Sequence, residues 1–185
     1  MERLILRQWR DEDLEPFAGM NADPEVMRHF PALLSRAESE ASMNVFRRAI
    51  DERGWGLWAV EVEGVFAGFT GLGIPRFTAH FTPCTEVGWR FRAEFWGRSL
   101  AYRAAREALS FGFMTLKLPE IVSFTAATNV RSQKLMKRLG LQYDARDDFD
   151  HPALPDGHIL RRHVLYRKKR ENESVDKDDI LLNHP

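Results

Sequence analysis

The chain has 185 residues, with 27 basic and 27 acidic side chains and a formal net charge of zero. This length suits one domain with a sizeable core, and the balanced charge gives no general electrostatic reason to bind nucleic acid or an anionic membrane. A lone cysteine, Cys84, excludes an intrachain disulfide and is typical of a reducing, cytoplasmic setting. The first residues are charged and contain no long apolar run, so we expect neither a signal peptide nor a transmembrane segment.

The N-terminal region predicts one strand followed by short helices. Residues 3–9 (RLILRQW) predict the strand. Acidic residues from Asp11 onward suit a helix N-terminus, where negative charge meets the positive end of the helix dipole. Asp23 followed by Pro24 predicts a second helix start, with aspartate as the N-cap and proline at the first helical position.

A longer helix is predicted next. Ser35 and Glu38 form a capping box, and Gly54 supplies a left-handed end. The apolar face expected for this helix consists of Ser42, Val45, Phe46, Ala49 and Ile50.

The middle of the chain predicts three strands. Residues 55–64 and 65–73 predict two strands joined by a hairpin turn at Glu63 and Gly64. Residues 85–91 (TEVGWRF) predict the third.

The last third alternates strands and helices. A helix from Ser99 to about Phe113, a strand over 120–126, a helix ending at Gly140 and a strand over 160–167 are predicted. The residues beyond, 169–185, are charge-dense, so we expect a flexible tail. Adjacent antiparallel strands followed by strand–helix–strand units predict a mixed sheet with helices on both faces.

The segment EFWGRSLAYRAA, residues 94–105, carries the first functional pattern. Small residues form one stripe of the helix that follows, so the helix can lie close to the sheet; they are Ala101, Ala104, Ala105, Ala108 and Gly112. Backbone N–H groups from Arg98 to Ala101 then face outward at the positive end of the helix, where they suit a phosphate. Gly97 permits a sharp turn, and Arg98 adds a charged donor. The alternative is an ordinary strand-to-helix turn in which Ser99 is the N-cap.

The segment TNVRSQKLMKRLGLQY, residues 128–143, carries the second pattern. Asn129 is a suitable N-cap for a helix whose apolar face holds Leu135, Met136 and Leu139. Ser132 lies one turn in on the same face. A plain capped amphipathic helix explains every feature except this serine.

These patterns in this order resemble the GNAT superfamily of N-acetyltransferases, and specifically its RimJ/RimL-like branch. The resemblance covers residues 2–167 and also includes ERLILRQWRDEDLEPFAGMNADPEVM near the start and RRHVLYR near the end. It implies an α+β fold with a GNAT-like mixed, mostly antiparallel central sheet and helices on both faces. It also implies that residues 1–168 form the acetyltransferase domain.

The resemblance implies that acetyl-CoA is the cosubstrate. The family's pyrophosphate loop, [QR]-x-x-G-x-[GA], lies over Trp96, Gly97, Arg98, Ser99, Leu100 and Ala101. Three positions depart from the pattern of the family or branch: Trp96 replaces a polar residue, Ser99 replaces the central glycine, and Arg103 replaces a glutamate. A serine fits this loop if its φ is negative, whereas a positive φ would cost about 1 kcal/mol or more.

By the same resemblance, Asn129 would contact the pantetheine arm of the cosubstrate. Many family members carry a tyrosine seven residues after this asparagine, as the acid that protonates the leaving thiolate. That position holds Met136, which cannot donate a proton. In the RimJ/RimL-like branch the serine three residues after the asparagine is the proposed substitute, which is Ser132.

The acceptor amine must lose a proton before or during attack, so a base or a water relay is required. Glu86 is the first candidate, because strand alternation places it on one face with Gly88 and Arg90, opposite Val87 and Trp89. It would either position the amine and act through water, or be an ordinary surface carboxylate. A backbone N–H of this strand would hold the thioester carbonyl, as in the family.

The segment near the C-terminus adds candidates for a second base. His151, His158 and His163 stand there, but His158 and His163 are five residues apart and would face opposite sides of a strand. We therefore expect no metal site. The expected acceptor cleft draws on residues 30–34, 76–84 and 147–157.

We thus expect transfer of an acetyl group from acetyl-CoA to a primary amine by direct attack in a ternary complex. The acceptor is either a protein N-terminus or a small-molecule amine, with no nucleic-acid or membrane partner, and the protein is a monomer or a homodimer. Two alternatives stay open: a catalytically silent acyl-CoA-binding sensor, and an interaction module that binds no CoA.

Overall fold

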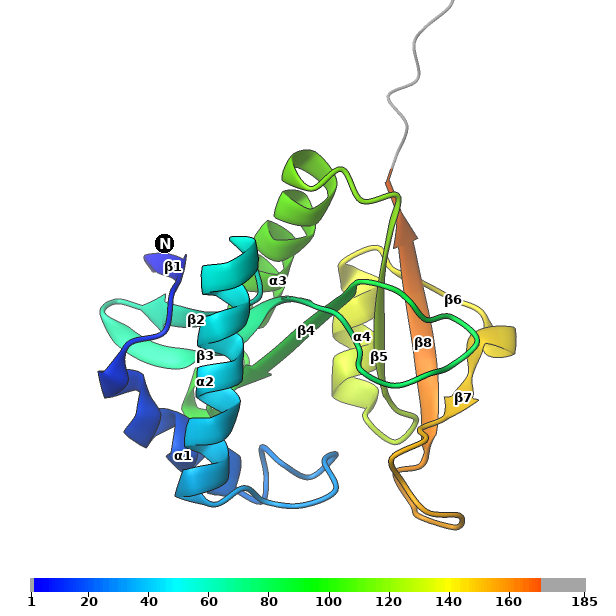
Figure 1. The fold of residues 1–185 in the computed structure, drawn as a ribbon, viewed down its shortest axis with the longest axis horizontal. Coiled ribbons are helices and arrows are strands. Elements are labelled where there is room, and N and C mark those ends of the chain that lie inside the picture. Colours follow the sequence, from blue (N-terminus) through cyan, green and yellow to red (C-terminus); the bar gives the residue numbers. More distant parts are fainter. Residues whose placement is uncertain (1, 171–185) are drawn as a thin grey trace, which may run out of the picture.

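The computed structural model describes residues 2–170 (Figure 1), and most of the predicted tail lies outside the described residues. The strands are β1 (Leu4–Arg7), β2 (Leu57–Val62), β3 (Val65–Gly73), β4 (Glu86–Phe91), β5 (Glu120–Ala126), β6 (Gln142–Tyr143), β7 (Phe149–Asp150) and β8 (Arg162–Lys169). The α-helices are α1 (Leu14–Ala22), α2 (Arg36–Arg53), α3 (Leu100–Ser110) and α4 (Val130–Arg138).

The strands form one sheet in the order β1-β2-β3-β4-β5-β8-β6, with β7 also paired to β8. Each pairing is antiparallel except that of β4 with β5, which is parallel. The predicted mixed, mostly antiparallel sheet is therefore confirmed. A parallel pair needs a crossover connection, and α3 supplies it between β4 and β5.

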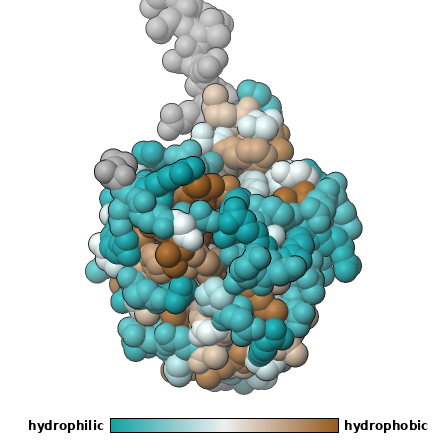
Figure 2. All heavy atoms as spheres, turned by 90° about the vertical axis from the view of Figure 1, so that its left-hand side faces the viewer, coloured by the Kyte–Doolittle hydropathy of each residue, from teal (hydrophilic) through white to brown (hydrophobic). Residues whose placement is uncertain are grey.

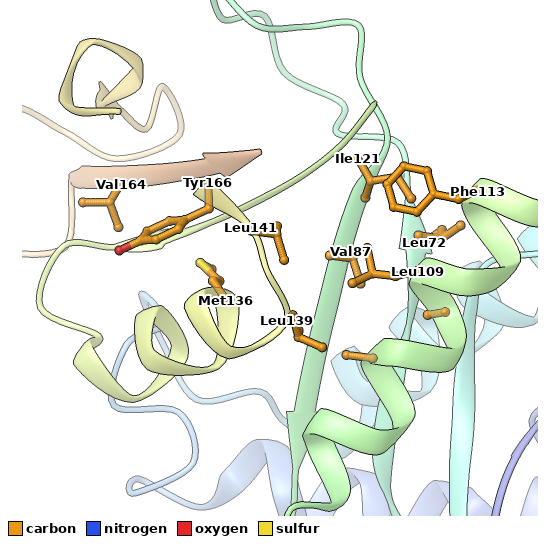
Figure 3. Close-up of a cluster of buried hydrophobic side chains, with 12 residues drawn as sticks. Leu72, Val87, Leu109, Phe113, Ile121, Met136, Leu139, Leu141, Val164 and Tyr166 are labelled. Atoms are coloured by element: carbon orange, nitrogen blue, oxygen red, sulfur yellow. The ribbon is translucent and has the colours of Figure 1, made fainter. Parts of the chain in front are cut away.

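Helices cover both faces of the sheet, as expected (Figure 1). On one face, Phe17 of α1 and Met43 of α2 pack with Trp9 against Ala59 and Phe69 of β2 and β3. On the other face, α3 and α4 pack against β3, β4, β5 and β8 through a second apolar cluster (Figure 3). The core lies in two layers because successive side chains of β2 and β3 point to opposite faces of the sheet.

The small-residue stripe on α3 brings that helix against the sheet. Ala104, Ala105 and Ala108 are completely buried between α3 and the central strands. At Gly112, in the π-helical turn that extends α3, a Cβ atom would lie 2.5 Å from Cδ1 of Ile121. This close approach holds the C-terminal end of α3 against β3 and β5.

The local predictions for α2 and the hairpin are confirmed at their ends. Ser35 Oγ accepts a hydrogen bond from the Glu38 amide, and Gly54 closes the helix with φ of 76°. Glu63 and Gly64 both have positive φ at the hairpin turn. The predicted apolar face of α2 is wrong in part, because the buried residues of this helix are Ser39 and Met43 and Val45 is exposed.

Two parts of the fold differ from the sequence prediction. Asp23 and Pro24 begin a run of turns instead of a helix, because the bond from the Met27 amide to the Asp23 carbonyl is not continued into a second helical turn. The strands β6 and β7 were not predicted, since each has two residues and shows no periodicity. Both are held by pairing with β8.

The outer surface is mostly hydrophilic on the face shown in Figure 2, where apolar side chains form separate patches. Within residues 2–170, no helix has both the length and the apolar character needed to cross a membrane.

Candidate active site

The central sheet opens between β4 and β5. Six residue pairs join β3 to β4 and seven join β5 to β8, but Glu86 and Val122 form the single pair between β4 and β5. The Ser123 hydroxyl donates to the Val87 carbonyl at 2.8 Å just beyond that pair. Beyond this contact β4 and β5 diverge, and no further residue pair joins these two strands within the described residues. The divergence forms a split in the middle of the sheet.

A cavity of about 1050 Å³ occupies this split. Its walls come from β4 on one side, from β5 and α4 on the other, and from the loop before α3. All predicted site residues except Arg98 line it: Glu86, Trp96, Gly97, Ser99, Leu100, Ala101, Asn129 and Ser132. Residues from two distant parts of the sequence therefore meet in one cavity, which is large enough for a cofactor-sized ligand.

The loop before α3 has the backbone shape of an anion cradle. Gly97 and Ser99 are both left-handed, with φ of 76° and 56°. The Arg103 amide donates to the Ser99 carbonyl, so the amides of Leu100, Ala101 and Tyr102 precede the first intrahelical bond of α3. Left-handed residues next to the positive end of a helix turn several N–H groups toward one point, which favours a phosphate.

Ser99 is the N-cap residue of α3, as the ordinary-turn interpretation expects, but its side chain forms no capping hydrogen bond. Its hydroxyl instead accepts a hydrogen bond from Nη1 of Arg138 at 3.1 Å. The positive φ of Ser99 is the strained conformation, which costs about 1 kcal/mol or more for a serine. The bond to Arg138 offsets part of that cost.

Two arginines of α4 flank the loop, and sequence reasoning assigned neither to the site. Arg131 lies over the Trp96 ring at 4.1 Å and Arg138 over the Tyr102 ring at 4.2 Å. Their spacing of seven residues puts both on one face of α4, which is the signal that could have revealed them. Arg98, by contrast, pairs with Glu2 and does not line the cavity.

The start of α4 holds the second predicted pattern. Asn129 Oδ1 accepts from the Ser132 amide at 3.2 Å, and Asn129 Nδ2 donates to Thr125 Oγ1 at 3.0 Å. Ser132 is partly buried and lines the cavity, whereas Met136 is only 1% exposed and points toward Tyr166 in the core (Figure 3). The two residues therefore lie in different environments, and Ser132 is the one that faces the split.

Glu86 lies on the cavity wall beside the last pair between β4 and β5. Burial raises the pKa of its carboxyl from 4.5 to about 8. A carboxyl in this range can exchange a proton near neutral pH. Glu86 is thus no ordinary surface carboxylate.

The pairing of β4 with β3 shows which backbone N–H group of β4 points into the split. The Arg92 amide donates to the Ala67 carbonyl of β3 at 3.0 Å. Because bonded pairs alternate in antiparallel strands, the backbone groups of Val87 and Trp89 face the other way, toward β5. The Val87 carbonyl is used by Ser123, so the Trp89 amide is the next donor beyond the contact, and it points into the split.

The rest of the cavity is lined by segments from both halves of the molecule. His29, Phe30 and Pro31 come from the turns between α1 and α2, and His151 and His163 from β8 and the segment before it. Burial lowers the pKa of both His151 and His163, so both are neutral at neutral pH. The expected contribution of residues 30–34 and 147–157 to the cleft is therefore confirmed in part.

Residues 76–84 do not line the cavity, so that expectation was wrong. Phe77, Phe81 and Cys84 pack instead against Phe124 and Phe149. This cluster supports the wall formed by β5. Among the described residues 2–170, no group of His, Cys, Asp or Glu side chains has the arrangement of a metal site.

Comparison with known proteins agrees with this geometry. The family described as the acetyltransferase (GNAT) domain matches residues 3–142. FsC-acetyl coenzyme A-N(2)-transacetylase of Aspergillus fumigatus is 30% identical over 159 residues, which make up 82% of this chain and 67% of that protein.

Solved structures share the fold. A GNAT-family acetyltransferase from Bacillus anthracis has a TM-score of 0.75 and 22% identity, covering 93% of this chain and all of that one. RimL, a ribosomal L7/L12 α-N-protein acetyltransferase solved with coenzyme A, has a TM-score of 0.70 and 10% identity, covering 90% and 93%. The family match extends over most of the chain, and the chain belongs to the GNAT family of acetyltransferases.

Proposed function

We propose that this protein transfers an acetyl group from acetyl-CoA to a primary amine by direct attack in a ternary complex. The observation that carries the proposal is the split between β4 and β5, which joins an anion cradle at Gly97 and Ser99 to a proton-exchanging carboxyl at Glu86 in one cavity. Acetyl-CoA would supply the activated acetyl group as a thioester.

The chain's own groups divide the work of binding. The amides from Gly97 to Ala101 would receive the pyrophosphate, together with the positive charges of Arg131 and Arg138. The side chain of Arg98 is directed to Glu2, so we assign Arg98 a contribution through its backbone only. Asn129 would contact the pantetheine arm at the start of α4.

Proton transfer and carbonyl polarisation would come from the centre of the split. The Trp89 amide would donate to the thioester oxygen. Glu86 would accept the proton of the attacking amine, directly or through water, with the neutral His151 and His163 as further candidates. The Ser132 hydroxyl would return a proton to the leaving thiolate.

Calorimetry with acetyl-CoA and thiol release from an amine panel test the proposal together. We expect saturable binding and thiol release with at least one of N-terminal peptides, polyamines, amino acids or aminoglycosides. Binding without transfer across the whole panel would instead support a silent acyl-CoA sensor, and absence of binding at millimolar ligand would reject both.

The acid role of Ser132 needs a separate measurement. The Ser132→Ala variant should lower kcat at saturating substrates, whereas Ser42→Ala, which removes a hydroxyl on α2, should not. An unchanged kcat in Ser132→Ala, with chemistry shown to be rate-limiting, would reject the role.

The finer assignments have less support. RimL itself acts on a protein N-terminus, and the likeness to it is one of fold, so membership of the RimJ/RimL-like branch remains a proposal. The domain boundary at residue 168, the cytoplasmic location and the monomeric or homodimeric state likewise stay predictions.

A further inference from the structure

Arg90 is a cation on the cavity wall that has no ionic partner among the residues that the structure describes. It lies on β4 on the same face as Glu86 and lines the cavity. Desolvation lowers the pKa of its guanidinium to about 10, and no charged group offsets that effect. Within residues 2–170, no carboxylate oxygen lies within 4.0 Å of it. A desolvated charge in a folded protein normally has an ionic partner, so Arg90 is suited to bind an anionic group of a ligand in the cavity.

The polar contacts of Arg90 among the described residues engage Nη1 and leave Nη2 available to a ligand. Nη1 donates to Asn21 Oδ1 at 2.6 Å, which is the one hydrogen bond formed by this side chain among the described residues. Nε is buried and has no acceptor. Nη2 forms no hydrogen bond within residues 2–170 and is not buried, so it is the donor that a carboxylate in the cavity can reach with a charged hydrogen bond.

The surroundings hold Arg90 in place for such a contact. Asn21 is completely buried, and its Nδ2 donates to the buried Ser39 hydroxyl at 3.1 Å, so α1 and α2 together fix the acceptor of Nη1. The guanidinium carbon lies 3.9 Å from the centroid of the Phe30 ring and 5.4 Å from that of Phe69. The cation is therefore positioned in advance between aromatic walls.

This face of β4 carries a carboxyl group at one end, on Glu86, and a guanidinium at the other, on Arg90. Glu86 and Arg90 are four residues apart, or about 13 Å between their backbones along a strand. The side chains shorten this separation, because the Glu86 carboxylate reaches over Gly88, where its Oε1 would lie 3.9 Å from a Cβ atom. The cavity's other carboxylate is Glu25, an exposed residue. A ligand between Glu86 and Arg90 would thus meet a proton-accepting group at one end and a fixed cation at the other.

We infer that the acceptor is a primary amine that also carries a carboxylate, as an amino acid does, and that Arg90 binds this carboxylate. The inference rests on the proposed function, because it names the substrate class of the same cavity. Arg90 is then a specificity-determining residue that acts on substrate binding.

Matched substrates test the inference. We propose measuring thiol release with L-phenylalanine against phenethylamine and with 6-aminohexanoate against hexylamine, which cover short and long separations of the two groups. The wild type should favour the carboxylate member of at least one pair by about tenfold or more in kcat/KM, since a charged hydrogen bond is lost with the other member.

The Arg90→Met variant should abolish that preference by raising the KM of the carboxylate member, so that both members of each pair are used with similar kcat/KM. Arg90→Lys keeps the positive charge but not the planar guanidinium and should retain part of the preference. Arg48→Met, which removes an exposed arginine of α2, is the matched control and should behave as wild type. Thermal melting and acetyl-CoA calorimetry establish that each variant is folded and binds the cosubstrate.

The possible outcomes distinguish a failure of the Arg90 assignment from a failure of the proposed function. Equal acetylation of both members of each pair by the wild type would overturn the assignment of Arg90 and leave the proposed function intact. A preference that survives in Arg90→Met would overturn it as well. If no amine is acetylated, the proposed function fails and this inference fails with it.

Discussion

At the scale of single residues, the left-handed Ser99 is the most unusual feature of the loop. Its φ of 56° is a conformation that side chains rarely adopt and that glycine adopts freely. The Ser99 hydroxyl accepts a hydrogen bond from Arg138, which a glycine could not do. The residue therefore combines backbone strain with a contact that joins α3 to α4.

Replacing Ser99 with glycine should separate these two effects. Ser99→Gly should be more stable than Ser99→Ala by about 1 kcal/mol, because both lose the hydroxyl but only glycine relieves the strain. Chemical unfolding of the two variants measures the difference. Equal stabilities would show that the backbone at this position is not strained.

Glu86 predicts a pH effect on stability. Its carboxyl titrates near 4.5 when unfolded and near 8 when folded, so between these values the native state holds a proton that the unfolded state has lost. Stability contributed by this proton is complete below pH 4.5 and declines as the pH rises toward 8. The stability of Glu86→Gln relative to wild type should therefore increase from about pH 4.5 to about pH 8 and then level off.

Unfolding of the wild type and of Glu86→Gln across this range checks the prediction, and the difference between them cancels the other titrating groups. A difference that does not change with pH would mean that the folded carboxyl titrates at its ordinary value. If Glu86 is the base, the variant should also lose the rise of kcat/KM toward pH 8.

At the scale of the elements, α4 and α2 begin with comparable caps, but of the two capping residues only Asn129 lines the cavity. Asn129 caps α4 and Ser35 caps α2, each through a side-chain oxygen. Asn129→Ala and Ser35→Ala should each lower the free energy of unfolding by about 1 kcal/mol. Only Asn129→Ala should also weaken acetyl-CoA binding in calorimetry. Equal affinities in the two variants would remove Asn129 from the pantetheine site.

The elements also show why sequence reasoning worked unevenly. The capping box of α2, the hairpin at Glu63–Gly64 and the cap at Asn129 were predictable because each depends on a few adjacent residues. The two-residue strands β6 and β7 depend on pairing with β8, which no local pattern reports. Asp23 and Pro24 carry a helix-start signal that the chain uses for turns instead.

At the scale of the whole molecule, the sheet behaves as two halves joined at one point. The Ser123 hydroxyl crosses from β5 to the Val87 carbonyl where the split begins, and the Thr70 hydroxyl makes a similar bond to the Gly88 carbonyl within the continuous half. Both donors are almost completely buried. The pair therefore offers a matched comparison between the junction and the interior of one half.

Ser123→Ala and Thr70→Val should each lower the free energy of unfolding by about 1–3 kcal/mol, because each removes the hydrogen bond of a buried hydroxyl to a backbone carbonyl. Only Ser123→Ala should also weaken acetyl-CoA binding, since it loosens the junction from which the split opens. Chemical unfolding and calorimetry measure the two effects. An equal loss of affinity in both variants would contradict a special role for the junction.

The sequence by itself determined the local features of this protein: the caps, the small-residue face of α3, the alternation along β4, and the two patterns that resemble GNAT acetyltransferases. Each of these depends on spacing within one helix or strand. The tertiary structure decided which of these groups share a cavity, that Ser99 is left-handed, that Met136 points into the core, and that Arg90 has no carboxylate partner among the described residues. These features depend on contacts between segments far apart in the chain and on the desolvation that packing imposes, and neither is encoded in the order of neighbouring residues.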